Sequence, residues 1–319
     1  MHGLEGRIRL MALLFYSKFD DPAEWGSHLC EAVPGLDFRV WPDVGDPADI
    51  VAALVWKAPE GELRKFPNLR QIINLGAGVD SIVKDRSLPP SIPIVRIADP
   101  EMARMMAQYV LAAVLRHHRD FVAFARVQKE RRWHYLHPRE TATCSVGIMG
   151  LGNLGATAAA ELVRQGFRVS GWARSAKKIE GVQSFHGASG LTPFLASSEI
   201  LVVMLPLTPA TESILNRETL GLLPRGAKLI NVGRGNLIDE TALIEAIRSG
   251  RIAEATLDVF RTEPLQPDSP LWDFDQVLIT PHLASVAIPR TAARQIAENL
   301  RRADAGEPLL NVVDPQRGY

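Results

Sequence analysis

The chain has 319 residues, 46% of them hydrophobic and 23% charged, which is enough for about two domains with full cores. Lysine plus arginine and aspartate plus glutamate each total 36, so the formal net charge of +0 excludes a global field that would attract nucleic acid or an anionic membrane. Two cysteines exclude a disulfide framework and favour a reducing, cytoplasmic location. The sequence also lacks a Cys/His cluster with zinc spacing, so we expect no bound metal.

The first part of the chain alternates strand-like and helix-like segments. Apolar runs predict strands at 8–16, 38–41, 50–56 and 71–75, and the stretches between them predict helices at 22–32 and 59–65. This alternation favours a parallel sheet covered on both faces. Basic residues precede the first run, as in a signal peptide, but the run is short and no small-residue cleavage site follows it. A first core strand is therefore the better interpretation.

A glycine-rich loop from Leu75 to Asp80 directly follows the last of these strands. Successive backbone amides in such a loop can form an anion-binding nest, although a plain glycine turn leading into a helix explains the pattern equally well. Trp56 stands at the end of the preceding strand. We interpret it as a wall that limits the size of a substrate, with simple packing in the core as an equal alternative.

A boundary is expected at 97–101, where prolines interrupt the pattern, and a helix rich in Met, Ala and Leu is predicted at 102–127. Packing in a core or an interface explains its methionines better than a cofactor site does. The polar and aromatic stretch at 131–138 predicts a loop before the next strand.

The stretch that follows has the pattern of a dinucleotide-binding β-α-β unit. An apolar run leads into Gly150-x-Gly152-x-x-Gly155, and a helix at 156–165 and a strand at 167–172 are predicted after it. Gly150 permits the tight turn, Gly152 lets a pyrophosphate approach the backbone, and Gly155 lets helix and strand pack closely. The amides at the start of the helix then face the phosphates. The alternative is a glycine turn in an unrelated α/β domain.

The end of the second strand of this unit indicates which dinucleotide is bound. Units that bind NAD place Asp or Glu there to bond the ribose 2′-hydroxyl. Here Arg174 and Ser175 follow the strand, with Lys177 and Lys178 close behind. No carboxylate is present to repel a 2′-phosphate, and a guanidinium that can pair with one takes its place. We therefore expect NADP(H) as the preferred cofactor and NAD(H) as a second option; a basic surface turn is the plain alternative.

The α/β alternation continues through the rest of the chain. Further strands are predicted at 200–205, 227–232, 255–259 and 277–280, and helices at 239–248 and 289–305. In doubly wound sheets, ligands bind beyond the carboxyl ends of the strands. Three polar residues of different chemical type follow the later strands, and they are Arg234, Glu263 and His282.

Together with a nicotinamide, these three side chains suffice for the reduction of a 2-keto acid. Arg234 would bind the substrate carboxylate and carbonyl oxygen through charge-assisted bonds. His282 would protonate the carbonyl oxygen, and Glu263 would hold the imidazole ring and favour its charged form. Each residue also has a plain interpretation: a surface ion pair for the arginine, a turn for the glutamate before proline, and a capped loop for the histidine.

Taken in order, the motifs resemble those of the D-isomer-specific 2-hydroxyacid dehydrogenases, and within them the bacterial glyoxylate/hydroxypyruvate reductases of type A. The matching motifs are LGAGVD at 75–80, GLGNLG at 150–155, WARS at 172–175, LPLTPAT at 205–211, NVGRG at 231–235, LDVFRTEPL at 257–265, TPHLA at 280–284 and RGY at 317–319. The resemblance implies NADPH-dependent reduction of glyoxylate to glycolate and of hydroxypyruvate to D-glycerate, with Arg234, Glu263 and His282 as the catalytic set. It also implies an α/β fold of two flavodoxin- or Rossmann-like domains with parallel sheets and an active site in the cleft between them.

The resemblance assigns a role to each domain. Residues 1–98 together with 288–319 would form the substrate-binding domain, where the amides of Ala77 and Gly78 help to hold the substrate carboxylate. Residues 99–287 would form the dinucleotide-binding domain. Beyond the three glycines, the expected cofactor contacts are Asn153, Leu154, Arg174, Ser175, Leu205, Pro206, Thr211, Val232, Gly233 and Asp258, the last of them near the nicotinamide amide. A homodimer is expected to pair through the helix after Ile97 and the loop around Trp133.

Two other functions stay open at this stage. Another D-2-hydroxyacid dehydrogenase that acts on a different 2-keto acid, such as a phosphoglycerate or erythronate-phosphate dehydrogenase, would use the same motifs. A nicotinamide-sensing binding protein is an alternative of another class, because relatives of the resembled family include transcriptional corepressors. The intact set of arginine, glutamate and histidine disfavours the sensor.

Overall fold

The structure is a computed structural model that describes residues 12–314. The packing divides the chain into two compact units. The first unit contains the chain up to Glu101 and again from Val286 onward, and the second unit is Met102–Ser285. The RGY motif at 317–319 and the first residues of the strand predicted at 8–16 lie outside the described residues. Within 12–314, no helix has both the length and the apolar character that crossing a bilayer requires.

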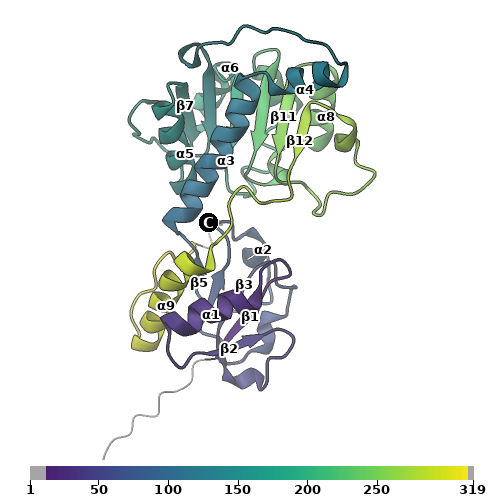
Figure 1. Ribbon diagram of the computed structural model, residues 1–319. Helices are drawn as coiled ribbons and strands as arrows, with labels where there is room; N and C mark the ends of the chain where they lie inside the picture. The colour runs from purple at the N-terminus through teal and green to yellow at the C-terminus, as the bar shows by residue number, and fades with distance from the viewer. Residues whose placement is uncertain (1–11, 315–319) are drawn as a thin grey trace, which may run out of the picture. The chain divides into compact units, whose positions relative to one another are not determined.

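The first unit is built on a five-stranded parallel sheet with the strand order β2-β1-β3-β4-β5 (Figure 1). Its strands are β1 (Ala12–Tyr16), β2 (Asp37–Val40), β3 (Ile50–Val55), β4 (Gln71–Asn74) and β5 (Ile94–Arg96). This is the flavodoxin-like order of a doubly wound sheet. The inner strands β1 and β3 contain only apolar residues, as expected for strands that are covered on both faces.

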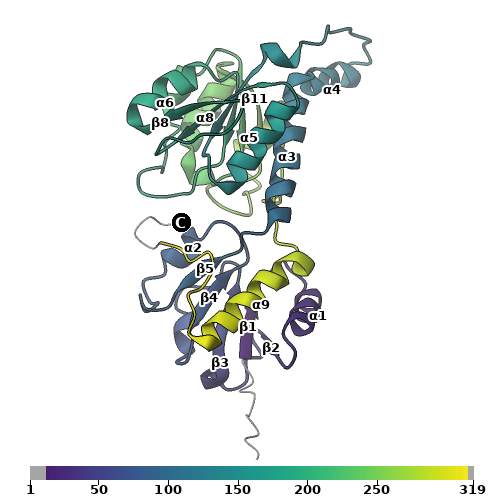
Figure 2. The same ribbon diagram turned by 90° about the vertical axis from the view of Figure 1, so that its left-hand side faces the viewer.

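Two helices from opposite ends of the chain pack against each other in this unit. They are α1 (Pro22–Ala32) and α9 (Pro289–Ala305), which Figure 2 shows side by side. Asp21 caps α1 by accepting a hydrogen bond from the amide of Ala23. α9 ends at Gly306, whose φ of 67° is the left-handed value that commonly terminates a helix. The chain therefore returns to the first unit after the second unit is complete.

The helix predicted at 59–65 is wrong, because this stretch contains only a short 3-10 turn, η2 (Leu63–Lys65). Gly61 has a φ of 78°, which interrupts a right-handed helix, and its amide donates to the Asp85 carboxylate at 3.0 Å. The apolar residues of the stretch still reach the core, since Leu63 is buried in the same cluster as strands β1 and β3. The short helix α2 (Asp80–Val83) follows the loop after β4.

The second unit contains a seven-stranded parallel sheet with the order β12-β11-β10-β9-β6-β7-β8 (Figure 1). Its strands are β6 (Ser145–Met149), β7 (Arg168–Ala173), β8 (Val182–His186), β9 (Ile200–Val203), β10 (Ala227–Asn231), β11 (Ile252–Leu257) and β12 (Val277–Ile279). This is the Rossmann order with one further strand at the edge. The predicted fold class, two α/β units with parallel sheets, is therefore confirmed.

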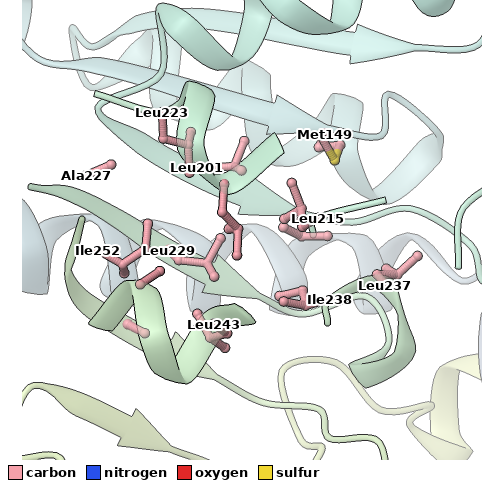
Figure 3. Packing of buried hydrophobic residues seen from close by; sticks show 14 of the residues in the cluster. Met149, Leu201, Leu215, Leu223, Ala227, Leu229, Leu237, Ile238, Leu243 and Ile252 are labelled. Carbon is pink, nitrogen blue, oxygen red and sulfur yellow. The ribbon is translucent and has the colours of Figure 1, made fainter. Parts of the chain in front are cut away.

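Helices cover both faces of this sheet and bury a separate apolar cluster on each. One face lies under α3 (Pro100–His118) and α5 (Asn153–Arg164), and Val110, Val114, Ala158 and Leu162 of these helices are buried there. The other face lies under α6 (Gly187–Ala196), α7 (Arg217–Leu222) and α8 (Glu240–Arg248). Figure 3 shows leucines and isoleucines of strands and helices meeting in this second cluster. The two layers fix the strands, and so they fix the loops that leave the strand ends.

The long helix predicted at 102–127 is in fact two helices, α3 and α4 (Phe121–Lys129). Asp120 separates them with a φ of 57°, a left-handed value that a continuous helix does not contain. The apolar pattern on each side of this residue is helical, and pattern alone did not reveal the break. Helix α5 begins at Asn153 and not at 156, so the second half of the glycine motif forms its first turn.

A buried polar cluster joins α3 to β11 in the second unit. His117 is 0% exposed, with Nδ1 2.7 Å from the Glu254 carboxylate and Nε2 3.0 Å from the Thr256 hydroxyl. Burial lowers the pKa of His117, and this effect outweighs the Glu254 carboxylate, which acts to raise that pKa. The fold therefore holds the neutral ring.

We expect the protein to lose stability as the pH falls below about 6.5, the ordinary pKa of histidine, because the unfolded chain then binds a proton that folded His117 resists. Above that pH the stabilising contribution of the neutral His117 ring to the free energy of unfolding is fully present. A His117→Asn variant cannot titrate at this position, so its free energy of unfolding should fall less steeply between about pH 7 and about pH 5. The two slopes of the free energy of unfolding against pH should differ by at most about 1.4 kcal/mol per pH unit. Urea titrations at several pH values measure both slopes, and equal slopes would contradict the prediction.

Candidate active site

The glycine motif forms the turn between β6 and α5, where the order of strands in the sheet reverses direction. Gly150 has a φ of 115°, and a Cβ atom there would lie 2.7 Å from the backbone oxygen of Met204. A Cβ atom at Gly155 would lie only 1.9 Å from the backbone oxygen of Gly150. Both positions require glycine, because the turn packs directly on the loop after β9 and on the first turn of its own helix.

Gly152 differs from the other two glycines because a Cβ atom there would meet nothing within 4 Å. It is the N-cap of α5 and makes no side-chain cap, so the first-turn amides of Asn153, Leu154 and Gly155 are not satisfied by a capping side chain. Open space in front of uncapped amides at the positive end of a helix suits an anionic group. The residues present therefore fit the phosphates of a dinucleotide.

Arg174 and Ser175 follow the last residue of β7 directly, and both are exposed. β7 pairs with β6 in parallel, so its carboxyl end lies next to the glycine turn. The preceding Trp172 is buried, and its indole nitrogen donates to the backbone oxygen of Gly187 at 2.9 Å. The guanidinium predicted to recognise a 2′-phosphate thus stands at the edge of the sheet that carries the glycine motif.

The loop after β9 is held by the hydroxyl of Thr211. This hydroxyl donates to the backbone oxygen of Pro206 at 2.7 Å and accepts from the amide of Thr208 at 2.8 Å. Gly233 lies beside Leu205, since a Cβ atom at Gly233 would lie 3.0 Å from the Leu205 oxygen. The amide of the neighbouring Val232 donates to the Val203 oxygen at 3.1 Å, which holds Val232 at the end of β9. The expected cofactor residues Leu205 and Gly233 are thus neighbours, and Thr211 has the structural role of holding the loop after β9.

Arg234 follows β10 in a loop that is fixed by Asn231, a buried residue that the sequence analysis missed. The Asn231 side chain accepts from the Gly233 amide at 3.1 Å and donates to the Arg234 oxygen at 3.0 Å. A Cβ atom at Gly235 would lie 1.9 Å from the backbone carbon of Phe260, so this loop packs directly on the loop after β11. The contact places the arginine loop beside the loop that carries Glu263.

Glu263 and His282 form a hydrogen-bonded pair. The Glu263 Oε2 atom lies 2.8 Å from Nδ1 of His282, and Oε1 accepts from the amide of Phe260 at 3.1 Å. A carboxylate can only accept, so Nδ1 carries the hydrogen, and a proton exchanged with a substrate would pass through Nε2. The two side chains are 23% and 19% exposed for His282 and Glu263 respectively, so the pair is shielded but reachable.

Asp258 directly follows β11, and its carboxylate is almost wholly buried. The resemblance seen in the sequence implies a place near the nicotinamide amide, and in the structure the Asp258 carboxylate bonds to the loop of His282. The carboxylate accepts from the Thr280 hydroxyl at 2.6 Å and from the amides of Leu283 and Ala284, each at 2.9 Å. Its backbone oxygen also accepts from the amide of His282 at 2.8 Å. Asp258 therefore determines where the histidine lies.

The expected substrate residues lie in the first unit, at the carboxyl ends of β3 and β4. The side-chain amide of Asn74 donates to the oxygens of Gly76 and Gly78 at 2.8 and 2.9 Å and so shapes the loop that contains Ala77. A Cβ atom at Gly76 would lie 2.5 Å from the Trp56 ring. Trp56 is half-buried and packs on this loop. The structure brings Trp56, Ala77 and Gly78 together within their unit.

No group of three or more His, Cys, Asp or Glu side chains within residues 12–314 is arranged to hold a metal ion. Both cysteines are free; Cys144 is buried and Cys30 is exposed. The carboxyl edge of the second sheet carries an arginine, a histidine bonded to a carboxylate, and uncapped helix amides. These groups suit a nucleotide-dependent oxidoreductase that acts on a small anionic substrate.

The match to known proteins defines the class. Residues 111–284 match the family described as D-isomer specific 2-hydroxyacid dehydrogenase, NAD binding domain. The chain belongs to this family, which confirms the resemblance seen in the motifs.

Three relatives illustrate the similarity over almost the full length. Glyoxylate/hydroxypyruvate reductase A of Serratia proteamaculans (strain 568) is 40% identical over 315 residues, which cover 97% of this chain and 100% of that protein. The crystal structure of a D-isomer specific 2-hydroxyacid dehydrogenase from Xanthobacter autotrophicus Py2 in complex with NADPH and MES is 58% identical, with a TM-score of 0.93 over 97% of this chain and 99% of that chain. The NADPH-dependent glyoxylate/hydroxypyruvate reductase of Sinorhizobium meliloti, crystallised with NADP and sulfate, is 36% identical with a TM-score of 0.91, over 97% of this chain and 100% of that chain.

The geometry of the glycine turn predicts that alanine at Gly152 mainly weakens cofactor binding, whereas alanine at Gly155 mainly lowers stability. Gly152→Ala should leave the free energy of unfolding nearly unchanged, since its methyl group meets no protein atom, but should weaken NADPH binding at least ~10-fold by blocking approach to the amides. Gly155→Ala should lower the free energy of unfolding by about 1–3 kcal/mol, because its methyl group overlaps the Gly150 carbonyl. Denaturant titration and fluorescence titration with NADPH measure the two effects. Tight binding by Gly152→Ala would contradict the placement of the phosphates.

Proposed function

We propose that this chain is an NADPH-dependent reductase that converts glyoxylate to glycolate and hydroxypyruvate to D-glycerate. The observation that carries the proposal is the bond between His282 and Glu263, formed at the same sheet edge as the uncapped helix amides behind Gly152. A proton donor held by a carboxylate beside a dinucleotide site is what reduction of a keto group needs. The reductases of Serratia and Sinorhizobium, similar over nearly the whole chain, support the choice of substrates.

The residues of the second unit would hold the cofactor at defined points. The first-turn amides of α5 would bind the pyrophosphate, and Arg174 with Ser175 would bind the 2′-phosphate. Leu205, Val232 and Gly233 would line the path toward the polar residues, and Asp258 would stand behind the nicotinamide. When bound, NADPH supplies the two electrons and one hydrogen that reduce the keto carbon. The NADPH and NADP complexes of relatives from Xanthobacter and Sinorhizobium support NADP(H) as the preferred cofactor.

The side chains of the chain itself perform the remaining steps. Arg234 would bind the carboxylate and the carbonyl oxygen of the 2-keto acid and draw electron density from the carbonyl. His282, with Nδ1 committed to Glu263, would deliver the proton from Nε2 to the carbonyl oxygen. Glu263 would stabilise the imidazolium and keep the ring in one orientation, because its second oxygen is fixed by the amide of Phe260.

The first unit would bind the substrate. We propose that residues 1–98 with 288–319 form the substrate-binding domain and residues 99–287 the dinucleotide-binding domain. The amides of Ala77 and Gly78 would hold the substrate carboxylate, in a loop shaped by Asn74. Trp56 packs on that loop at Gly76 and would limit the size of the group on the keto carbon.

We also propose a cytoplasmic homodimer. The two free cysteines suit a reducing compartment. The loop around Trp133 carries aromatic side chains that a lone chain leaves in water, with Trp133 and Tyr135 99% and 75% exposed. This loop and the helix after Ile97 would form the contact between subunits.

A panel of 2-keto acids tested with NADPH and with NADH decides the function. The proposal expects the highest kcat/KM for glyoxylate and hydroxypyruvate with NADPH. A higher value for a larger 2-keto acid would favour another dehydrogenase of the family. Binding of NADPH without its oxidation by any 2-keto acid would favour a nicotinamide sensor.

His282→Gln should lower kcat by ~10²–10⁴-fold, because glutamine can hydrogen-bond but cannot supply a proton. The affinity for NADPH should stay nearly unchanged, since none of the expected cofactor contacts is altered. His28→Gln in α1 is the matched control and should behave as the unchanged protein. A loss in kcat of less than ~10-fold would remove His282 as the proton donor.

Arg174→Asp should move the cofactor preference toward NADH, because a carboxylate repels the 2′-phosphate and can bond a ribose hydroxyl. The ratio of kcat/KM values for NADPH and NADH measures the change, which should be at least ~10-fold. Arg225→Asp carries the same change of charge before β10, at the opposite end of the strands, and serves as the control. A ratio that stays the same in Arg174→Asp would rule out a bond between this guanidinium and the phosphate.

A further inference from the structure

The loop that carries His282, residues 280–285, belongs to no helix or strand, and we call it the histidine loop. His282 itself has a φ of 56°, a left-handed conformation that is uncommon for residues other than glycine and has to be maintained by surrounding contacts. The Asp258 carboxylate provides three of these contacts, through the Thr280 hydroxyl and the amides of Leu283 and Ala284. The position of the proton donor therefore depends on the contacts that keep the side chains of Asp258 and Thr280 in place.

A tyrosine on α3 completes this arrangement. The Tyr109 hydroxyl lies 2.5 Å from the Thr280 hydroxyl, which in turn lies 2.6 Å from the Asp258 carboxylate. A threonine hydroxyl has one hydrogen, and the carboxylate can only accept, so Thr280 donates to Asp258. Tyr109 must then donate to Thr280. The hydrogen bonds run in one direction, from the phenol through the hydroxyl to the carboxylate, and each strengthens the next.

The surroundings of Tyr109 keep it in the donor form. Its side chain is half-buried against the apolar cluster of α3 and α5. Burial raises the pKa of Tyr109, and the Asp258 charge acts in the same direction, so the phenol keeps its proton. A second bond ties the histidine loop to the same helix, because the Ser285 hydroxyl donates to the Met102 oxygen at 2.8 Å. Helix α3 thus holds both ends of the loop.

We propose that Tyr109 and Thr280 are positioning residues for the reaction, which orient the Asp258 carboxylate so that it fixes the histidine loop and aims the imidazole of His282. The inference rests on the proposed function, since it assumes that His282 is the proton donor. Neither residue touches the substrate or the cofactor in this scheme. Their removal should therefore act on kcat and on the mobility of the loop more than on the KM for NADPH.

Four variants separate positioning from packing. Thr280→Val removes the donor to Asp258 at nearly constant volume and should lower kcat by ~10–100-fold. Tyr109→Phe removes only the outer bond and should lower kcat by ~3–10-fold. Thr280→Ser restores the hydroxyl and should recover kcat to within ~3-fold of the unchanged protein. Thr143→Val, which removes a hydroxyl bonded to the Glu140 oxygen before β6, is the matched control and should leave kcat unchanged.

The double variant tests whether the two residues act in one chain. If the phenol works through Thr280, Tyr109→Phe should change kcat by less than ~2-fold when Thr280 is already valine. If the two residues instead contribute independently through packing, the fold losses in kcat of the two single variants should multiply in the double variant. A double variant whose loss equals the product of the two single losses would therefore overturn the inference.

Hydrogen exchange supplies a readout that needs no cofactor and no turnover. The amides of Leu283 and Ala284 donate to Asp258, so Thr280→Val should speed their exchange at least ~5-fold in the cofactor-free protein, while amides of β9 stay unchanged. Exchange equal to that of the Thr143→Val control, or faster exchange with an unchanged kcat, would overturn the inference. If the unchanged protein reduces neither glyoxylate nor hydroxypyruvate, the proposed function fails, and the exchange rates alone decide whether Tyr109 and Thr280 hold the loop.

Discussion

The buried carboxylate of Asp258 is the contact on which the rest of the candidate site depends. It accepts one hydroxyl and two amide hydrogen bonds from residues 280–284. The Asp258 backbone also bonds to Asn231 at the end of β10 and to His282 in the loop after β12. Burying a carboxylate is costly unless donors surround it, so the loop that brings these donors is held where they are needed. The histidine is placed by the same bonds that satisfy this charge.

Close approach of backbones extends this order along the sheet edge. A Cβ atom at Gly150 would overlap Met204, one at Gly233 would crowd Leu205, and one at Gly235 would overlap Phe260. The loops after neighbouring strands therefore touch one another in a row. The uncapped amides of α5 stand near one end of the row and the Glu263–His282 pair near the other. Because parallel strands all end at the same edge, the fold concentrates these groups without a special arrangement of any one loop.

The roles that we propose for the two units follow from the chemistry of their side chains and loops. The second unit carries the uncapped helix amides, Arg234 and the bonded histidine, while the first carries the Trp56 ring packed on a glycine loop that Asn74 shapes. A dinucleotide needs the first kind of surface, and a small carboxylate with a short side group needs the second. Membership in the D-isomer specific 2-hydroxyacid dehydrogenase family agrees with both, and it sets the class of reaction before any substrate is chosen.

Local pattern was enough to derive the alternation of strands and helices, the glycine turn, the absence of a carboxylate at Arg174 and the three polar residues after strand ends, because periodicity and the steric demands of glycine act over a few residues. The tertiary structure decided the rest. Gly61 and Asp120 break predicted helices with left-handed backbone that the apolar pattern does not reveal. Thr280 and Tyr109 gain their importance only from partners in other loops and helices, and the two residues are 171 positions apart in the chain. A hydrogen bond over that separation has no signature in either segment, because only the packing of α3 on the sheet brings the two hydroxyls together.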